Sequence, residues 1–294
     1  MDRISFIKHL AFLPLGMKLK SLSELFSSAE ETKKMPLLFL GHGSPMNAIE
    51  ENEFVSSFRK LGTELPRPRA ILCISAHWET KGSFVTAMTK PRTIHDFSGF
   101  PKELFAVQYA APGSPELAQL TKNLITTTNI GLDHEWGLDH GTWSVVKHLY
   151  PNADIPIIQM SLDYTKGAAY HYELGSELQK LRSKGVLIIG SGNMVHNLRL
   201  LAWDKFSQDN YAYDWALEAN SKMKEWINLG QHDKLIDFKS QGKAFDLSIP
   251  SPEHYLPLIY ILSLMDKKDE FSFFNDKYVA GSLSMSSLKV ISRA

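Results

Sequence analysis

From Pro36 onward the chain alternates short apolar runs with longer segments of helical periodicity. Runs rich in Val, Ile and Leu are typical of strands that are covered on both faces. Their alternation with helices predicts an α/β fold, with a mostly parallel central sheet flanked by helices. We predict strands over residues 37–40, 70–75, 84–88, 155–160 and 186–189. We predict helices over residues 115–124, 168–182, 211–229 and 255–264, and two further strands in 270–291 around residues 275–277.

The chain of 294 residues shows no internal repeat, low-complexity tract or linker. A chain of this length buries roughly three quarters of its unfolded surface, so we predict one domain over residues 35–294 with its active site at the carboxyl ends of the strands. Residues 1–34 interleave apolar side chains with Lys and Arg. We interpret them as a helical N-terminal extension, because Lys8, Pro14 and Gly16 interrupt the apolar stretch that a signal peptide needs.

No apolar run reaches the roughly 18 residues of a membrane span. We therefore expect a soluble, cytoplasmic protein, with export through the N-terminal extension left open. Lys plus Arg number 32, as do Asp plus Glu, and the formal net charge is +0. The chain thus lacks the basic field that binding to nucleic acid requires.

The one cysteine, Cys73, lies inside an apolar run, where we expect a small buried side chain. It excludes an intrachain disulfide and any multi-cysteine metal cluster. Histidine, in contrast, occurs 11 times. Because histidine is the commonest metal ligand and acid/base side chain near neutral pH, this surplus is the first indication of function.

Three of these histidines follow predicted strands. They are His42 in the run GHGSP, His77 in SAHW and His196 in GSGNMVHN. In open α/β sheets, ligands bind outside the carboxyl ends of the strands, so these side chains can share one site although they are far apart in sequence. A fourth, His254, lies in PEHYLP, where two prolines define the entry to an apolar helix. We expect His254 to complete the cluster.

Each strand-end histidine taken singly could be structural, but three together favour a metal or acid/base site. The paired glycines around His42 and Ser191 lack the rest of a dinucleotide fingerprint and are followed by no P-loop lysine. Neither a G-x-S-x-G elbow nor an H-E-x-x-H helix occurs.

His140 and His95 are weaker candidates for this site. We expect no chemical role for the remaining histidines, which are His9, His134, His148, His171 and His232.

A histidine-rich site without thiolates suits iron, zinc, copper or nickel rather than magnesium or calcium. Such a site can host a zinc-bound water or a ferrous ion with open positions, and spacing does not separate the two. Aromatic residues near the histidines in sequence suggest a planar, partly apolar substrate. They are Trp78, Trp136, Trp143, Phe97, Phe100 and Tyr255.

Taken together, the histidine motifs resemble those of the 4,5-DOPA extradiol dioxygenase family. This family belongs to the class III extradiol ring-cleavage dioxygenases and is similar to the catalytic subunit of protocatechuate 4,5-dioxygenase. The likeness extends over about residues 36–291, with all motifs in the expected order. The motifs lie at residues 41–46, 75–78, 93–101, 139–143, 192–198 and 252–258. The extension 1–34 is the main departure.

The resemblance implies a non-haem enzyme that opens a catechol, such as DOPA by 4,5-cleavage, with O2 as the second substrate. It implies Fe2+ as the working cofactor, or Zn2+ in the protein as purified. The metal ligands would be His42, His77, His196 and His254, with Glu253 beside the last of them as a less certain contributor. His196 would be a ligand, the catalytic acid/base, or both.

The same resemblance implies that His140 takes part in catalysis and contacts the substrate. We expect the motifs around it to contribute further substrate contacts from His95, Asp96 and Trp78. The expected partners are a small aromatic diol and O2, in a monomer or small homo-oligomer.

Two other functions stay open at this point. One is a zinc-dependent hydrolase that uses the same histidines with Glu253 as base. The other is a metal-free scaffold of the same fold that serves in protein interaction.

Overall fold

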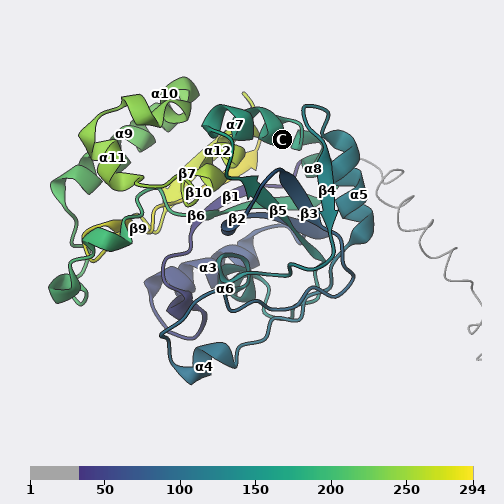
Figure 1. Ribbon diagram of the computed structural model, residues 1–294, viewed down its shortest axis with the longest axis horizontal. Coiled ribbons are helices and arrows are strands. Elements are labelled where there is room, and N and C mark those ends of the chain that lie inside the picture. The colour runs from purple at the N-terminus through teal and green to yellow at the C-terminus, as the bar shows by residue number, and fades with distance from the viewer. Residues whose placement is uncertain (1–32, 294) are drawn as a thin grey trace, which may run out of the picture.

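The computed structural model of the protein describes residues 33–293. The predicted extension therefore falls almost wholly outside the described residues. Figure 1 shows one central sheet with helices on both of its faces, which confirms the predicted α/β class. None of the described helices is long and apolar enough to cross a membrane.

The central sheet has eight strands in the order β4-β3-β5-β2-β6-β1-β10-β7. Strands β5, β2, β6 and β1 at its centre run parallel to one another, whereas β10 and β7 add an antiparallel edge. The strands are β1 Leu37–Gly41, β2 Ala70–Thr80, β3 Ser83–Thr86, β4 Ile130–Asp133, β5 Ile157–Asp163, β6 Val186–Gly192, β7 Asp269–Phe274 and β10 Ser287–Ser292, with a separate pair β8 Tyr278–Val279 and β9 Leu283–Ser284.

The α-helices are α3 Glu53–Glu64, α4 Lys102–Phe105, α5 Pro115–Leu124, α6 His140–Leu149, α7 Ala168–Ser176, α8 Gln179–Ser183, α9 Asp214–Asn228, α10 His232–Ile236, α11 Lys243–Ser248 and α12 Leu256–Ser263. Short 3-10 helices lie at η1 Pro45–Ala48, η2 Leu198–Leu200, η3 Trp203–Lys205 and η4 Phe238–Ser240. In Figure 1, α3 and α6 cover one face of the sheet, and α7 and α12 cover the other.

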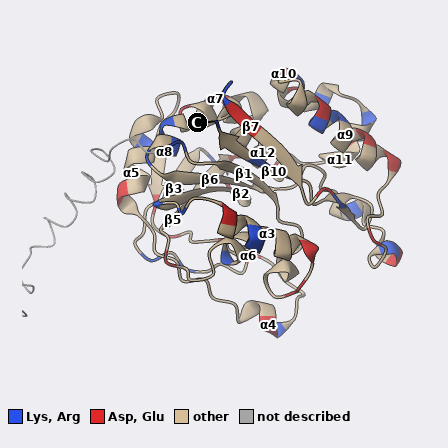
Figure 2. Cartoon of the chain, turned by 180° about the vertical axis from the view of Figure 1, so that it is seen from behind, with Lys and Arg blue, Asp and Glu red and all other residues tan. Residues whose placement is uncertain are grey.

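Alternate residues of the central strands supply two separate cores, because successive side chains of a strand point to opposite faces. Leu37 and Phe39 of β1 pack with α7, α9 and α12, while Leu38 and Leu40 pack with α3 and α6. Cys73 of β2 is fully buried in the second core, as expected. Figure 2 shows that Lys, Arg, Asp and Glu are interspersed over the outer helices, whereas the central strands carry few of them.

Several element boundaries differ from the sequence prediction. Strand β2 continues to Thr80, so that His77 lies within it, inside the stretch between Ile74 and Glu79 where the register with β5 shifts. The predicted helix over 168–182 divides into α7 and α8. The C-terminal strand β10 pairs with β7, and the short β8 and β9 lie between them in the chain.

Helices α3 and α6 were not expected, although each has a clear N-terminal cap. Asn52 accepts a hydrogen bond from Val55 N at the start of α3, and Asp139 accepts one from Thr142 N at the start of α6. Helix α6 is buried on nearly all sides, so it lacks the amphipathic pattern that identifies a surface helix.

Candidate metal centre and substrate cavity

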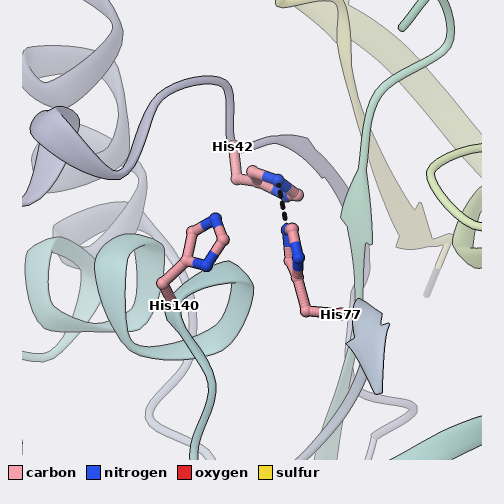
Figure 3. Close-up of side chains that lie close together, drawn as sticks. All are labelled: His42, His77 and His140. Atoms are coloured by element: carbon pink, nitrogen blue, oxygen red, sulfur yellow. Dashed lines mark hydrogen bonds between the residues drawn. The ribbon is translucent and has the colours of Figure 1, made fainter. Parts of the chain in front are cut away.

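Five histidines from separate segments meet at the carboxyl edge of the parallel strands. His42 follows β1, His77 lies near the end of β2, and His140 is the first residue of α6. His196 follows β6, and His254 precedes α12. Figure 3 shows the rings of His42, His77 and His140 turned toward one another. The convergence expected from strand-end positions is therefore present.

The distances between the rings are short. The ring centroid of His42 lies 5.0 Å from that of His77 and 5.2 Å from that of His254. The rings of His77 and His140 are 3.9 Å apart. His196 stacks on His254 with centroids 3.4 Å apart and an interplanar angle of 5°. The four histidines proposed as ligands thus lie together, and His140 lies beside them.

Potential ligand atoms form two groups, and the atoms of each lie within 4.8 Å of one another. One group is His42, His77 and His140, and the other is His196, Glu253 and His254. The four proposed ligands are therefore divided between the two groups, and Glu253 joins the second one.

Glycines allow these segments to approach so closely. A Cβ atom on Gly192 would lie 2.1 Å from the backbone oxygen of His254, and that oxygen accepts a hydrogen bond of 2.9 Å from Asn193 N. A Cβ on Gly141 would lie 2.8 Å from Cδ2 of His77. The backbone of β6 and the first turn of α6 can thus contact the histidine segments only without a side chain at these positions.

The hydrogen bonds of His42 determine which of its ring nitrogens is free. Ser191 Oγ donates its proton to the carbonyl oxygen of Gly141, so it accepts at 3.0 Å from Nδ1 of His42. The lone pair of His42 Nε2 is then directed at Nε2 of His77, 3.1 Å away (Figure 3).

This arrangement fits a bound metal ion. Two nitrogens that each lie about 2.0–2.1 Å from one zinc ion are separated by about 2.8–3.4 Å at coordination angles near 90–109°, and the two Nε2 atoms are 3.1 Å apart. Asp96 Oδ2 lies 3.5 Å from Nδ1 of His77, and Glu253 Oε1 lies 3.1 Å from Nδ1 of His254. Carboxylates in these positions orient a histidine ligand from behind.

The site also keeps its histidines neutral. Burial, reinforced by neighbouring imidazoles, lowers the pKa of His42 and of His254 well below the ordinary value. Burial is likewise the main cause that lowers the pKa of His77 to about 3 and that of His196 to about 4. Since metals bind the neutral imidazole, these rings are in the form that a metal requires.

His140 is held by Asp96. The Asp96 carboxylate accepts hydrogen bonds of 2.9 Å from both the backbone nitrogen and Nδ1 of His140. Burial alone would raise the pKa of Asp96, but the hydrogen bonds and charge interaction with His140 lower it. Asp139, the preceding residue, is a helix cap that is buried against Ser75 and Gln159. It therefore supports α6 and has no place in the cavity wall.

The histidines line the base of a cavity of about 510 Å³. The wall carries aromatic and aliphatic side chains, namely Phe54, Phe97, Phe100, Leu198, Leu201, Trp203, Phe206, Val279, Leu283 and Met285. A mostly apolar cavity with a few convergent polar groups is the usual form of a small-molecule site. Its size and lining accommodate a substituted aromatic ring.

Three of the four predicted substrate contacts do not line this cavity. His95 donates a hydrogen bond from Nε2 to the backbone oxygen of Val107, 3.0 Å away, and packs on Trp143. Trp78 is buried and stacks on Trp136. Asp96 lies behind the wall, where its carboxylate contacts His140 and His77. Of the predicted contacts, His140 alone lies in the wall.

The cavity also has wall residues that sequence reasoning did not single out. Glu50 and Asn52 lie between η1 and α3, Phe54 lies in the first turn of α3, and a second group lies in the segment after His196. These positions carry no recognisable motif. The one available signal was Asn52, which is a favoured cap residue before a helical segment.

Comparisons with known proteins agree with the geometry of the site. Residues 36–283 match the family described as the catalytic LigB subunit of aromatic ring-opening dioxygenase. The chain is 46% identical over 261 residues to the 4,5-DOPA dioxygenase extradiol of Escherichia coli K12, covering 87% of this chain and 95% of that protein. It is 34% identical to the 4,5-DOPA dioxygenase extradiol of Beta vulgaris, covering 86% and 96%.

A solved structure is also similar. The crystal structure of an uncharacterized Escherichia coli K12 protein matches with a TM-score of 0.75 and 42% identity, covering 87% of this chain and 99% of that chain. Neither the hydrolase nor the scaffold alternative finds support in these relatives. The chain therefore belongs to the LigB family, and it is an aromatic ring-opening dioxygenase, an oxidoreductase whose family uses a non-haem metal bound by histidines.

Proposed function

We propose that this protein opens the ring of a catechol beside its two hydroxyl groups, as in the 4,5-cleavage of DOPA. The observation that carries the proposal is the convergence of five imidazoles at the base of an aromatic-lined cavity. The reaction consumes one catechol and one O2. Both oxygen atoms enter the product, which carries an aldehyde and a carboxylate where the ring bond was broken, so no further reductant is needed.

We further propose that His42, His77, His196 and His254 hold the metal, which is Fe2+ in the working enzyme and Zn2+ in protein purified in air. Histidine sites follow an affinity order that favours zinc over ferrous iron. A bound ferrous ion would supply the redox activity that allows O2 to react with an aromatic ring.

Within this site His196 moves the proton. As a general base it takes a proton from a catechol hydroxyl, and it later returns that proton to the product, a role commonly worth roughly 10²–10⁴ in rate. Its pKa of about 4, lowered chiefly by burial, keeps the ring able to accept a proton at neutral pH. His196 would serve as a ligand in the zinc form and as the acid/base in the ferrous form.

His140 orients the substrate. Asp96 fixes its Nδ1, so the opposite nitrogen can hydrogen-bond a catechol oxygen. The phenylalanines of the wall exclude water and pack on the aromatic ring. His95 supports this wall from behind, because its ring centroid lies 5.8 Å from that of Phe97.

Oxygen uptake tests the proposal. Protein reconstituted with ferrous iron under anaerobic conditions is mixed with aerated buffer and a panel of catechols that includes DOPA. We expect one O2 consumed per catechol and a yellow ring-opened product. The variant His42→Ala should lose stoichiometric metal and activity, whereas His134→Ala, at an exposed loop position, should retain both. Product formation without O2 uptake, or full metal retention by His42→Ala, contradicts the assignment.

We also expect the protein to act in the cytoplasm as a monomer or small homo-oligomer. Cell fractionation and light scattering on the purified full chain test these two expectations.

A further inference from the structure

Glu50 differs from every other charged residue near the cavity. It is the one Asp, Glu, Lys or Arg among the described residues of the cavity wall. The acids that follow it in sequence are neutralised, since Glu51 pairs with Arg59 and Glu53 pairs with Lys277. The Glu50 carboxylate has no hydrogen bond or ion pair with any described residue. It is therefore an uncompensated negative charge beside an apolar cavity.

The position of Glu50 is set by the segment that also carries His42. Asn47 Nδ2 donates to His42 O at 2.9 Å, and Asn52 Nδ2 donates to Asn47 Oδ1 at 2.8 Å. Glu50 N donates to Met46 O at 2.9 Å. These bonds connect both ends of the η1 segment, so Glu50 stands on an ordered turn at a defined place relative to the histidines.

Among the described residues, the wall carries no Lys or Arg that could pair with a carboxylate. Lys147 donates to the carbonyl oxygen of Ala48 and does not line the cavity. Arg199 is exposed on η2, outside the described wall residues. An anionic substituent that reached Glu50 would meet a like charge, whereas an ammonium group would form a charge-assisted hydrogen bond.

We propose that Glu50 selects catechols whose ring substituent ends in a protonated amine and disfavours those whose substituent ends in a carboxylate. The inference rests on the proposed ring cleavage, since it concerns the substrate of that same cavity. A substituent that carries both groups, as in DOPA, falls between the two classes because one group is attracted and the other repelled. Glu50 is thus a specificity-determining residue that takes no part in the bond-breaking chemistry.

The test compares three catechols that differ only at the end of a short side chain. They are 2-(3,4-dihydroxyphenyl)ethylamine, 3-(3,4-dihydroxyphenyl)propionate and the uncharged reference 4-ethylcatechol. Values of kcat/KM on the ferrous enzyme are divided by the value for 4-ethylcatechol. Dissociation constants on the zinc-loaded protein, measured by calorimetry, provide a readout that does not depend on turnover. The variants are Glu50→Gln, Glu50→Lys and, as a matched control, Glu51→Gln.

For the wild-type protein we expect the amine to exceed the carboxylate in normalised kcat/KM by roughly tenfold, a modest ratio because Glu50 is exposed and partly screened. Glu50→Gln should bring the ratio close to one, and Glu50→Lys should invert it. Glu51→Gln should keep the wild-type ratio, because the control removes the same charge from a side chain outside the wall. Added salt should reduce the wild-type ratio and leave that of Glu50→Gln unchanged.

Failures of the two proposals are distinguishable. If the wild-type protein cleaves neither DOPA nor any of the three catechols, the proposed function is wrong. If the catechols are cleaved but the ratio is the same in the wild type and Glu50→Gln, or if Glu51→Gln changes the ratio as much, the role of Glu50 is wrong and ring cleavage stands. Dissociation constants that show no charge preference in the wild type also overturn it.

Discussion

Three of the five imidazoles of the cavity are oriented by a hydrogen-bond partner at Nδ1. Ser191 engages Nδ1 of His42, Asp96 engages Nδ1 of His140, and Glu253 engages Nδ1 of His254. In each case the remaining nitrogen is free to face the cavity. The sequence motifs predicted these histidines and Asp96 as site residues. The role of Ser191 follows only from the tertiary structure, which places β6 beside α6.

Replacing His196 by Ala tests its role in proton transfer. We expect kcat to fall by roughly 10²–10⁴, with a smaller change in the dissociation constant of the catechol, because the ring of His254 stacked on His196 stays in place. Stopped-flow absorbance gives kcat, and anaerobic calorimetry on the ferrous form gives the dissociation constant. Ring cleavage at a near wild-type rate would refute the assignment.

His171 gives a prediction for stability and pH. It is fully buried, with Nδ1 3.0 Å from the hydroxyl oxygen of Tyr260 and Nε2 3.3 Å from Asp163 O. Burial lowers its pKa to about 4 from the ordinary value of 6.5. Between these values the unfolded chain binds the extra proton, so stability is complete above about pH 6.5 and falls as the pH is lowered toward 4.

The variant His171→Gln removes this titration. The free energy of unfolding of the wild type should fall by up to about 3 kcal/mol more than that of the variant between pH 7 and pH 4. Urea denaturation of metal-free protein at several pH values measures the difference. The exposed His134→Gln serves as the control, and equal pH dependence in the wild type and His171→Gln would show that His171 does not titrate in this way.

At the scale of elements, the site depends on the contact between the end of β6 and the segment before α12. The backbone oxygen of His254 accepts from Asn193 N, directly beside Gly192. The sequence alone did not show which segment approaches Gly192, because His254 lies more than sixty residues from β6 in the chain.

Gly192→Ala should therefore displace His254. The new Cβ would lie 2.1 Å from a backbone oxygen, which cannot rotate away as a side chain can. We expect turnover to fall on the order of a hundredfold, as a misplacement of about 1 Å does at other active sites, together with lower metal content by elemental analysis. Gly167→Ala is the control, since nothing lies within 4 Å of its added Cβ. Equal metal content and turnover in the two variants would contradict the prediction.

At the scale of the whole molecule, hydrogen bonds of Arg182 join four parts of the chain. Its guanidinium forms a bidentate pair with Asp269 of β7 at 2.7 and 2.8 Å, and both side chains are fully buried. It also donates to Met35 O before β1 and to Leu264 O after α12. The antiparallel edge of the sheet is thus joined to α8 and to the start of the domain.

Arg182→Leu should destabilise the fold by about 3–5 kcal/mol, because it leaves the Asp269 carboxylate buried without its partner. Thermal unfolding of the metal-free protein measures the loss. Arg59→Leu removes an arginine whose pair with Glu51 is exposed and should change the melting temperature little. A similarly small change in Arg182→Leu would show that the buried pair is dispensable.

The amino-acid sequence by itself determined the α/β class, the central strands and the histidines near their ends, because apolar periodicity and strand-end motifs are local properties of the chain. The tertiary structure alone decided what lies between those histidines and around them. The pairing of His196 with His254, the burial of α6 and the place of Glu50 in the cavity wall all arise from contacts between segments distant in sequence. Such contacts depend on how the folded chain packs, which cannot be predicted from local periodicity.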